Sequence, residues 1–259
     1  MATKSKALQK DAPASTSVAV RKPAGGAVVS IQAALAAQAA SMADRTLPPS
    51  GSKIKLSPGK MSLPDGTQTP GPIESVVVDF IARNMFYPTG YDKNNIVPPV
   101  CFAQGTDPRK LAPSPNSPEP QATDCASCAM NAFGSAPNGK GKACKNERLL
   151  ALLPPDDAEA PLWTLSVSPT GTKGFDGYVT GVVRTFNVPP VGVVTEIGLD
   201  ANSEYPVATF GNPQPVADPT DFMARQAEAR DLLMVEPDLT GYKAAPAPKK
   251  GAQRPAARR

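Results

Sequence analysis

The amino-acid sequence predicts a mainly β protein whose sheet is interrupted by a cysteine-bearing loop. Several short segments alternate polar and apolar residues or are rich in β-branched residues, as strands are. One longer segment has apolar residues at helical spacing, and all four cysteines fall within 101–144. The chain of 259 residues also carries 31 prolines and 20 glycines, which indicates long loop-rich parts.

The predicted strands begin with two short alternating segments, 53–56 and 60–63, the second followed by a turn at Pro64-Asp65-Gly66. The strongest strand is predicted at 73–87, because it contains the run Val76-Val77-Val78 and is long enough to bend across a barrel. Further strands are predicted at 149–153, 162–167, 191–199 and 205–210.

A helix is predicted at 172–186, where Phe175, Val179, Val182 and Phe186 recur at helical spacing. An alanine-rich helix at 28–45 and a last helix at 221–234 flank the strands. A helix between the third and fourth strands of a five-stranded barrel is the arrangement of the oligonucleotide-binding (OB) fold, so we predict an OB-like β-barrel. The predicted segments are a basic tail and helix at 1–50, the core at 51–215 with an insertion at about 97–148, and a helix with a basic tail at 216–259.

The cysteines predict a structural metal site. Cys125-Ala126-Ser127-Cys128 lets two thiolates reach one Zn²⁺ from a tight turn, and two more thiolates complete a tetrahedron. The chain has no histidine, and four protein ligands leave no open position for catalysis. We therefore predict a structural Zn²⁺ held by Cys101, Cys125, Cys128 and Cys144. Two disulfides, free thiols and an iron–sulfur cluster are the alternatives.

Basic residues and aromatics near this site predict contacts with nucleic acid. Phosphates would meet the positive charges around the last cysteine, and bases would stack on the aromatics that follow the long strand. A solvated basic loop and ordinary core packing are the respective alternatives. The Walker spacing of phosphate-cradling loops is absent, so nucleotide hydrolysis is not expected. The predicted contact residues are Lys140, Lys142, Lys145, Arg148, Phe86, Tyr87 and Tyr91.

The remaining composition argues against an enzyme. Histidine, the commonest general base near neutral pH, is missing, and no nucleophile-and-base pair is visible, so we expect no catalysis and no small-molecule substrate. The two ends, 1–22 and 243–259, hold 11 of the 27 basic residues and one of the 23 acids. Such tails indicate either a polyanion partner or a solubilising role. No apolar run reaches the length of a membrane span or of a secretory signal, so we expect an intracellular protein with no membrane partner.

The segment 76–210 resembles a family of phage-encoded proteins, most of them without a characterised function. More distantly, a zinc-bearing insertion in an OB barrel is similar to the single-stranded DNA-binding proteins of tailed phages. The chain departs from these in having only cysteine ligands and a basic rather than acidic C-terminal end. The residues that carry the likeness are Val77–Phe80, Asn84–Tyr87, Pro98–Phe102, Cys125–Cys128, Asn131–Ser135, Gly139–Cys144, Leu165–Thr170 and Val193–Ile197.

This resemblance implies a role in phage DNA replication or recombination, in the cytoplasm of a bacterial host. We therefore predict a non-catalytic, sequence-independent single-stranded DNA-binding protein, whose partners would include phage replication or recombination proteins. The alternative is a phage structural or adaptor protein that uses the zinc loop and the 28–45 helix for protein–protein contacts.

Overall fold

The computed structural model describes residues 52–89, 97–240 and 242, together with Ile31, 33–35, 37 and 38. The chain divides into two compact units, Met1–Pro48 and Pro49–Arg259. The described residues of the first unit are helical, in agreement with the helix predicted at 28–45, most of which lies outside the described residues. Within the described part of the chain, no helix is long and apolar enough to cross a membrane.

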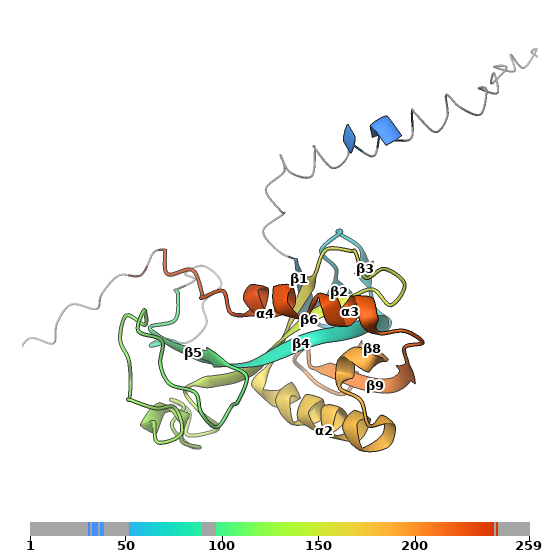
Figure 1. Cartoon of the computed structure of the whole chain (residues 1–259). Helices are drawn as coiled ribbons and strands as arrows, with labels where there is room; N and C mark the ends of the chain where they lie inside the picture. The colour runs from blue at the N-terminus through green and yellow to red at the C-terminus, as the bar shows by residue number, and fades with distance from the viewer. Residues whose placement is uncertain are drawn as a thin grey trace, which may run out of the picture. The chain divides into compact units, whose positions relative to one another are not determined.

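The second unit is mainly β, with a curled sheet and few helices (Figure 1). The sheet order is β3-β2-β1-β7-β6-β4-β8-β9, and β5 pairs with β4 outside this path. The strands are β1 (Lys53–Ser57), β2 (Lys60–Ser62), β3 (Gln68–Thr69), β4 (Ile73–Phe86), β5 (Cys101–Gly105), β6 (Lys145–Leu153), β7 (Trp163–Val167), β8 (Val193–Leu199) and β9 (Ala208–Pro215). The helices are α2 (Pro169–Phe186), α3 (Thr220–Ala224) and α4 (Gln226–Leu233), with short 3-10 turns η1 (Ala129–Asn131) and η2 (Pro190–Gly192).

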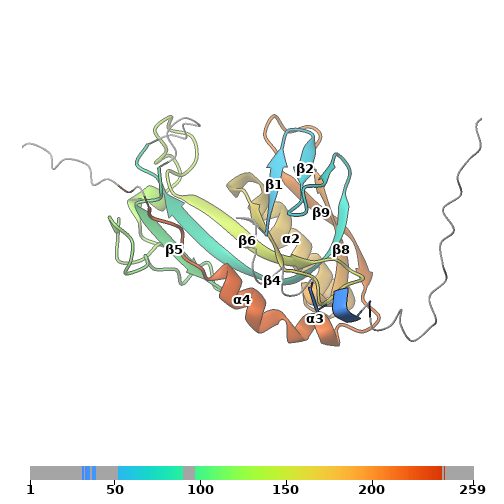
Figure 2. The same ribbon diagram turned by 90° about the horizontal axis from the view of Figure 1, so that it is seen from above.

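The long strand β4 is the strand on which the sheet is built. One of its edges pairs with β6, while the other pairs with β8 over Ile73–Val76 and with β5 over Ala82–Phe86. The register with β6 shifts between Val77 and Asp79. A bulge of this kind bends a strand and increases its twist. The sheet consequently curls into a half barrel (Figure 2).

The strands follow a Greek-key path. β4, β6 and β7 form an antiparallel meander, the chain passes through α2, and β8 returns beside β4. Among the described residues, no pairing between β7 and β9 closes a barrel, since the outer edge of β7 pairs in parallel with β1. The sheet is therefore an open half barrel, which confirms the predicted mainly β fold, while the OB-like barrel stays a prediction.

Helix α4 is attached to the β4 bulge by polar contacts. The Gln226 Nε2 group donates a hydrogen bond to the Val78 carbonyl oxygen at 3.2 Å. The Arg230 Nε group donates to the Asp79 carboxylate at 2.7 Å, forming an ion pair. Asp79, which the sequence presents as an acid in an apolar strand, is thus an anchor for α4.

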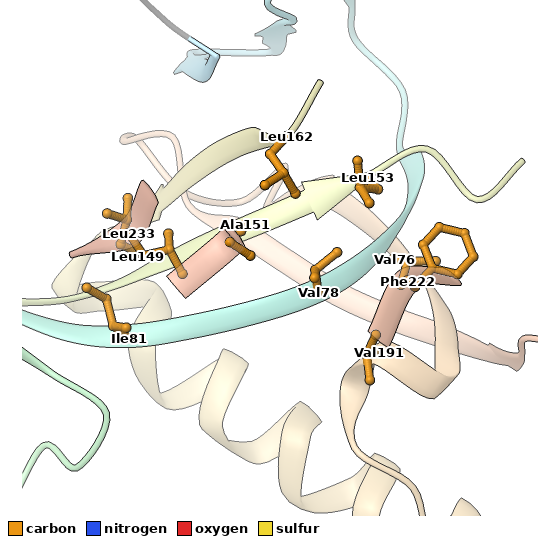
Figure 3. Close-up of a cluster of buried hydrophobic side chains, with 11 residues drawn as sticks. Val76, Val78, Ile81, Leu149, Ala151, Leu153, Leu162, Val191, Phe222 and Leu233 are labelled. Carbon is orange, nitrogen blue, oxygen red and sulfur yellow. The ribbon is translucent and has the colours of Figure 1, made fainter. Parts of the chain in front are cut away.

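Two hydrophobic cores lie on the two faces of the sheet. On one face, α3 and α4 cover a cluster shown in Figure 3, which includes Val78 and Ile81 of β4, Leu149 of β6, and Leu233 of α4. On the other face, α2 inserts Phe175 into a second cluster. Figure 1 shows α2 on one side of β4 and α3 with α4 on the other. The second cluster comprises Ile54, Met61, Val77, Leu150, Leu152, Leu165, Val167, Phe175, Ile197 and Ala208.

Truncating the side chain of Leu233, the last residue of α4, should destabilise the fold strongly. Leu233 is fully buried in the first core, so Leu233→Ala is expected to lower the free energy of unfolding by about 2–4 kcal/mol, through lost transfer energy and a new cavity. Chemical denaturation measures this change. The adjacent Met234, 41% exposed, is the control, and Met234→Ala should cost less than about 1 kcal/mol. Equal costs for the two substitutions would show that α4 does not pack as described.

The strands and helices predicted in the second unit are confirmed, with differences in their extent, and the two-residue strand β3 was not predicted. β5 was not expected inside the insertion, and β6 begins at Lys145 rather than at residue 149. β9 begins at Ala208 rather than at residue 205, and the last helix is divided at Arg225. The start of β6 was missed because its first residues are polar and show no apolar pattern. They form a strand because their backbone pairs with β4.

Candidate functional site

The insertion, which contains β5 and the long loop between β5 and β6, is fastened to one end of the β4–β6 pair (Figure 2). Cys101 begins β5 opposite Phe86, and Cys144 directly precedes β6. Backbone hydrogen bonds fold the segment between them: the Cys125 amide donates to the Leu111 carbonyl at 2.9 Å, and the Cys144 amide donates to the Met130 carbonyl at 2.8 Å. These contacts bring cysteines from distant parts of the sequence to one place.

All four cysteines line the same small cavity, of about 10 Å³, roughly the space of one water-sized sphere. Three of the four are buried and Cys128 is partly exposed. Burial raises the pKa of the Cys144 thiol to about 12, and the charges of the other three cysteines add to this rise. The pKa of Cys125 is also raised, mainly by burial, while a hydrogen bond with Asn84 opposes the rise. All four cysteines therefore lie around one small, partly open cavity.

The cysteines are free, so the disulfide alternative finds no support in the structure. Within the described residues, no three His, Cys, Asp or Glu side chains meet as a ready-made metal group. The Zn²⁺ ion therefore stays a prediction, although the shared cavity gives its four expected ligands a common position.

A chain of asparagines connects this cavity with the surface, and the sequence reasoning missed it. The Asn131 Nδ2 group donates to the Cys125 carbonyl at 2.6 Å, and the Asn146 Nδ2 group donates to the Asn84 side-chain oxygen at 2.7 Å. The Lys142 ammonium joins the two, donating to Asn131 Oδ1 at 3.1 Å and to Asn146 Oδ1 at 2.9 Å. Asn131 and Asn146 lie three and two residues after a cysteine, and this spacing is the signal that could have found them.

A larger pocket, of about 810 Å³, opens beside the insertion. It contains two of the predicted aromatics, Phe86 and Tyr87, and one predicted lysine, Lys145. Burial, together with the nearby negative charge of Glu147, raises the pKa of Tyr87 above its ordinary value. The walls come from the end of β4, the insertion and the segment after α4: Met85–Thr89, Val97–Pro99, Met130, Ser135–Pro137, Ala143, Lys145, Pro237, Asp238 and Thr240.

The other predicted contact residues that the structure describes do not line this pocket, and they differ in their exposure and in their partners. Lys140 and Lys142 are exposed on the insertion. The Arg148 guanidinium is instead committed to Asp176 of α2, with Nε to Oδ1 at 3.0 Å and Nη2 to Oδ2 at 2.8 Å, and its side chain is 10% exposed. It therefore lies apart from the pocket. Tyr91 lies outside the described residues.

The segment after α4, residues 234–240, contacts the insertion and forms one wall of the large pocket, which the sequence did not predict. Gln104 Nε2 donates to the Leu233 carbonyl at 3.0 Å. The Glu236 carboxylate accepts hydrogen bonds from Ser114 Oγ at 2.5 Å and Asn116 Nδ2 at 2.8 Å. The Tyr242 hydroxyl donates to Glu119 at 2.7 Å. The insertion is thus held between the sheet and this segment.

Comparison with protein families, with curated proteins and with solved structures found no match. The site must therefore be interpreted from its own chemistry. It joins a mostly apolar pocket with two aromatic side chains, a lysine at its rim, and a glycine-rich loop carrying further lysines.

Proposed function

We propose that this protein binds single-stranded DNA without catalysis and with little sequence preference. The observation that carries the proposal is the pocket at the end of β4, which unites Phe86, Tyr87 and Lys145. Aromatic faces beside positive charge are the usual means of holding single strands, because every base can stack and every nucleotide carries a phosphate. Stacking contributes about 1–3 kcal/mol per base, independently of sequence.

The Greek-key path supports the same proposal. OB folds are five-stranded, partly open Greek-key barrels that bind oligonucleotides on the face of their second and third strands, together with the loop between the first two strands and the loop between the last two. We infer that β4, β6, β7, β8 and β9 correspond to these five strands, with α2 between the third and fourth. The insertion then occupies the ligand-binding loop between the first and second strands, which is where it borders the pocket.

The structural ion in this proposal is Zn²⁺, held by Cys101, Cys125, Cys128 and Cys144. The ion-sized cavity lined by these four residues fits such a role. Bound zinc would act as a cross-link that holds thiolates from three parts of the chain, without a free coordination position for chemistry. The chain's own residues would do the binding, and the cross-link would fix the lysine-bearing loop beside the pocket.

We infer the location and the partners from the resemblance to phage proteins rather than from the geometry. The protein would act in the cytoplasm of a bacterial host, with phage replication or recombination proteins as partners. The pocket itself requires only a flexible strand that carries phosphates and unpaired bases.

Titration of a fluorescein-labelled oligo-dT with the full chain tests the proposal. We expect an anisotropy increase at 50 mM salt, weaker binding to a duplex of equal length, and a log–log salt slope of about −2, as for roughly three phosphate contacts. An unchanged anisotropy at low salt would exclude the proposed function. Tighter binding of the duplex would also contradict it, because stacking needs unpaired bases.

A protein-binding adaptor is the second candidate, favoured by exposed apolar residues next to the same pocket. Val235, two residues before the pocket-lining Pro237, is 66% exposed. Light scattering after size exclusion distinguishes the candidates. A discrete assembly formed in the absence of nucleic acid, together with no oligonucleotide binding, would favour the adaptor.

A further inference from the structure

Phe133 is the most exposed of the large apolar side chains in the described residues, at 84%. It follows the short turn η1 at the tip of the insertion, two residues before Ser135. A single exposed apolar residue is common on protein surfaces and needs no explanation by itself. The residues around Phe133 indicate what could bind to its exposed ring.

The backbone that carries Phe133 is held by hydrogen bonds on both sides. The Ser135 hydroxyl donates to the carbonyls of Met130 and Ala132, at 2.9 and 2.7 Å, and accepts the Ala143 amide at 2.9 Å. The Gly134 amide donates to the Gly141 carbonyl at 2.7 Å. Gly134 has a φ of +89°, which side-chain-bearing residues rarely adopt. The ring is therefore presented to solvent from a defined turn.

The same turn forms a wall of the large pocket. Met130 and Ser135, three residues before and two residues after Phe133, both line it. A strand that leaves the pocket over this wall would therefore come next to the Phe133 ring. The exposed aromatic therefore lies on the same turn as two residues of the pocket wall.

The charge of the segment favours a polyanion as the occupant. Between Asp124 and Glu147 the chain carries Lys140, Lys142 and Lys145 and no acid. These three lysines attract phosphates, while Asp238 in the pocket wall and Glu147, two residues after Lys145, offset part of their charge. The occupant with both phosphates and flat apolar faces is a single-stranded nucleic acid.

We propose that Phe133 is a second stacking position, which receives a base of the strand that continues from the pocket across the tip of the insertion. This inference rests on the proposed function and extends it, because it lengthens the binding path from the pocket to the tip. Lys140 on the same tip would contact the backbone phosphate there.

Substitutions at Phe133 test the inference, since an 84% exposed side chain contributes little to folding. With oligo-dT, Phe133→Ala and Phe133→Leu should each weaken binding about ten-fold, while Phe133→Tyr should retain the wild-type affinity. Leucine keeps an apolar surface but lacks an aromatic face, so it separates stacking from a general hydrophobic contact. Met223→Ala is the control, because Met223 is 51% exposed on α3 and does not line the pocket.

A fluorescent variant gives a readout that does not depend on affinity. Phe133→Trp should show oligonucleotide-dependent quenching beyond that of the wild type, whose single tryptophan, Trp163, lies on β7. If the wild type binds oligo-dT but Phe133→Ala binds equally well and Phe133→Trp is not quenched, the inference is overturned and the proposed function stands. If the wild type itself does not bind, both fall.

Discussion

Replacing Cys128 by serine is expected to abolish zinc binding and to unfold the insertion while the half barrel stays folded. The wild-type chain should carry about one Zn²⁺, because four cysteines share one ion-sized cavity. The insertion has little core of its own, since its buried cluster with the sheet consists of Ala82, Ala103, Leu111 and Cys125. The two large cores contain no cysteine, so they should survive the loss. Metal analysis and limited proteolysis within 106–144 measure both effects.

Cys128 suits this experiment because it is the least buried of the four cysteines. The substitution therefore removes little packing, and any large loss of structure reports the missing cross-link. Ser127→Ala, one residue away, is the control and should keep the zinc and the protease resistance. Undenatured wild-type protein without metal, or a Cys128→Ser protein as resistant as the wild type, would contradict the zinc assignment.

Reversing the charges of Lys140 and Lys145 is expected to weaken oligo-dT binding about 10- to 100-fold at low salt and to make the salt slope shallower by about 1.4. Each lysine would neutralise one phosphate, and each glutamate would repel it. These two lysines lie outside the asparagine chain that uses Lys142, so the double variant should keep the insertion folded.

The control for this charge change is the pair Lys55→Glu and Lys60→Glu, on exposed positions of β1 and β2. It alters the net charge equally but leaves the insertion unchanged, and it should shift the affinity less than about three-fold. Equal losses in the two double variants would show that overall charge, rather than the proposed surface, attracts DNA.

The fold was largely predictable because its main elements have clear local signals. The valine run of β4 and the helical spacing of Phe175 and Val182 reflect burial on one or both faces, and burial leaves a pattern in the sequence. The open edge was not predictable in the same way. Whether β7 pairs with β9 or with β1 depends on which strand reaches its edge, and both choices use the same apolar pattern.

The candidate site was predictable only in part, because its contacts join distant residues. Phe86, Tyr87 and Lys145 do meet in one pocket, since β4 and β6 pair there. The partner of Arg148, in contrast, is Asp176, 28 residues later on another element, and no local pattern links them. The pocket wall formed by 237–240 was missed for the same reason. This segment has no local pattern that would predict its contact with the insertion.

Photo-crosslinking with an oligo-dT that contains 5-iododeoxyuridine, followed by peptide mass spectrometry, tests the central claim most directly. The account predicts crosslinks in two stretches, at Phe86 and Tyr87 at the end of β4 and at Phe133 on the insertion, with none on α2. Crosslinks confined to α2 or α3 would contradict the proposed interface, and an absence of crosslinks would contradict the proposed function.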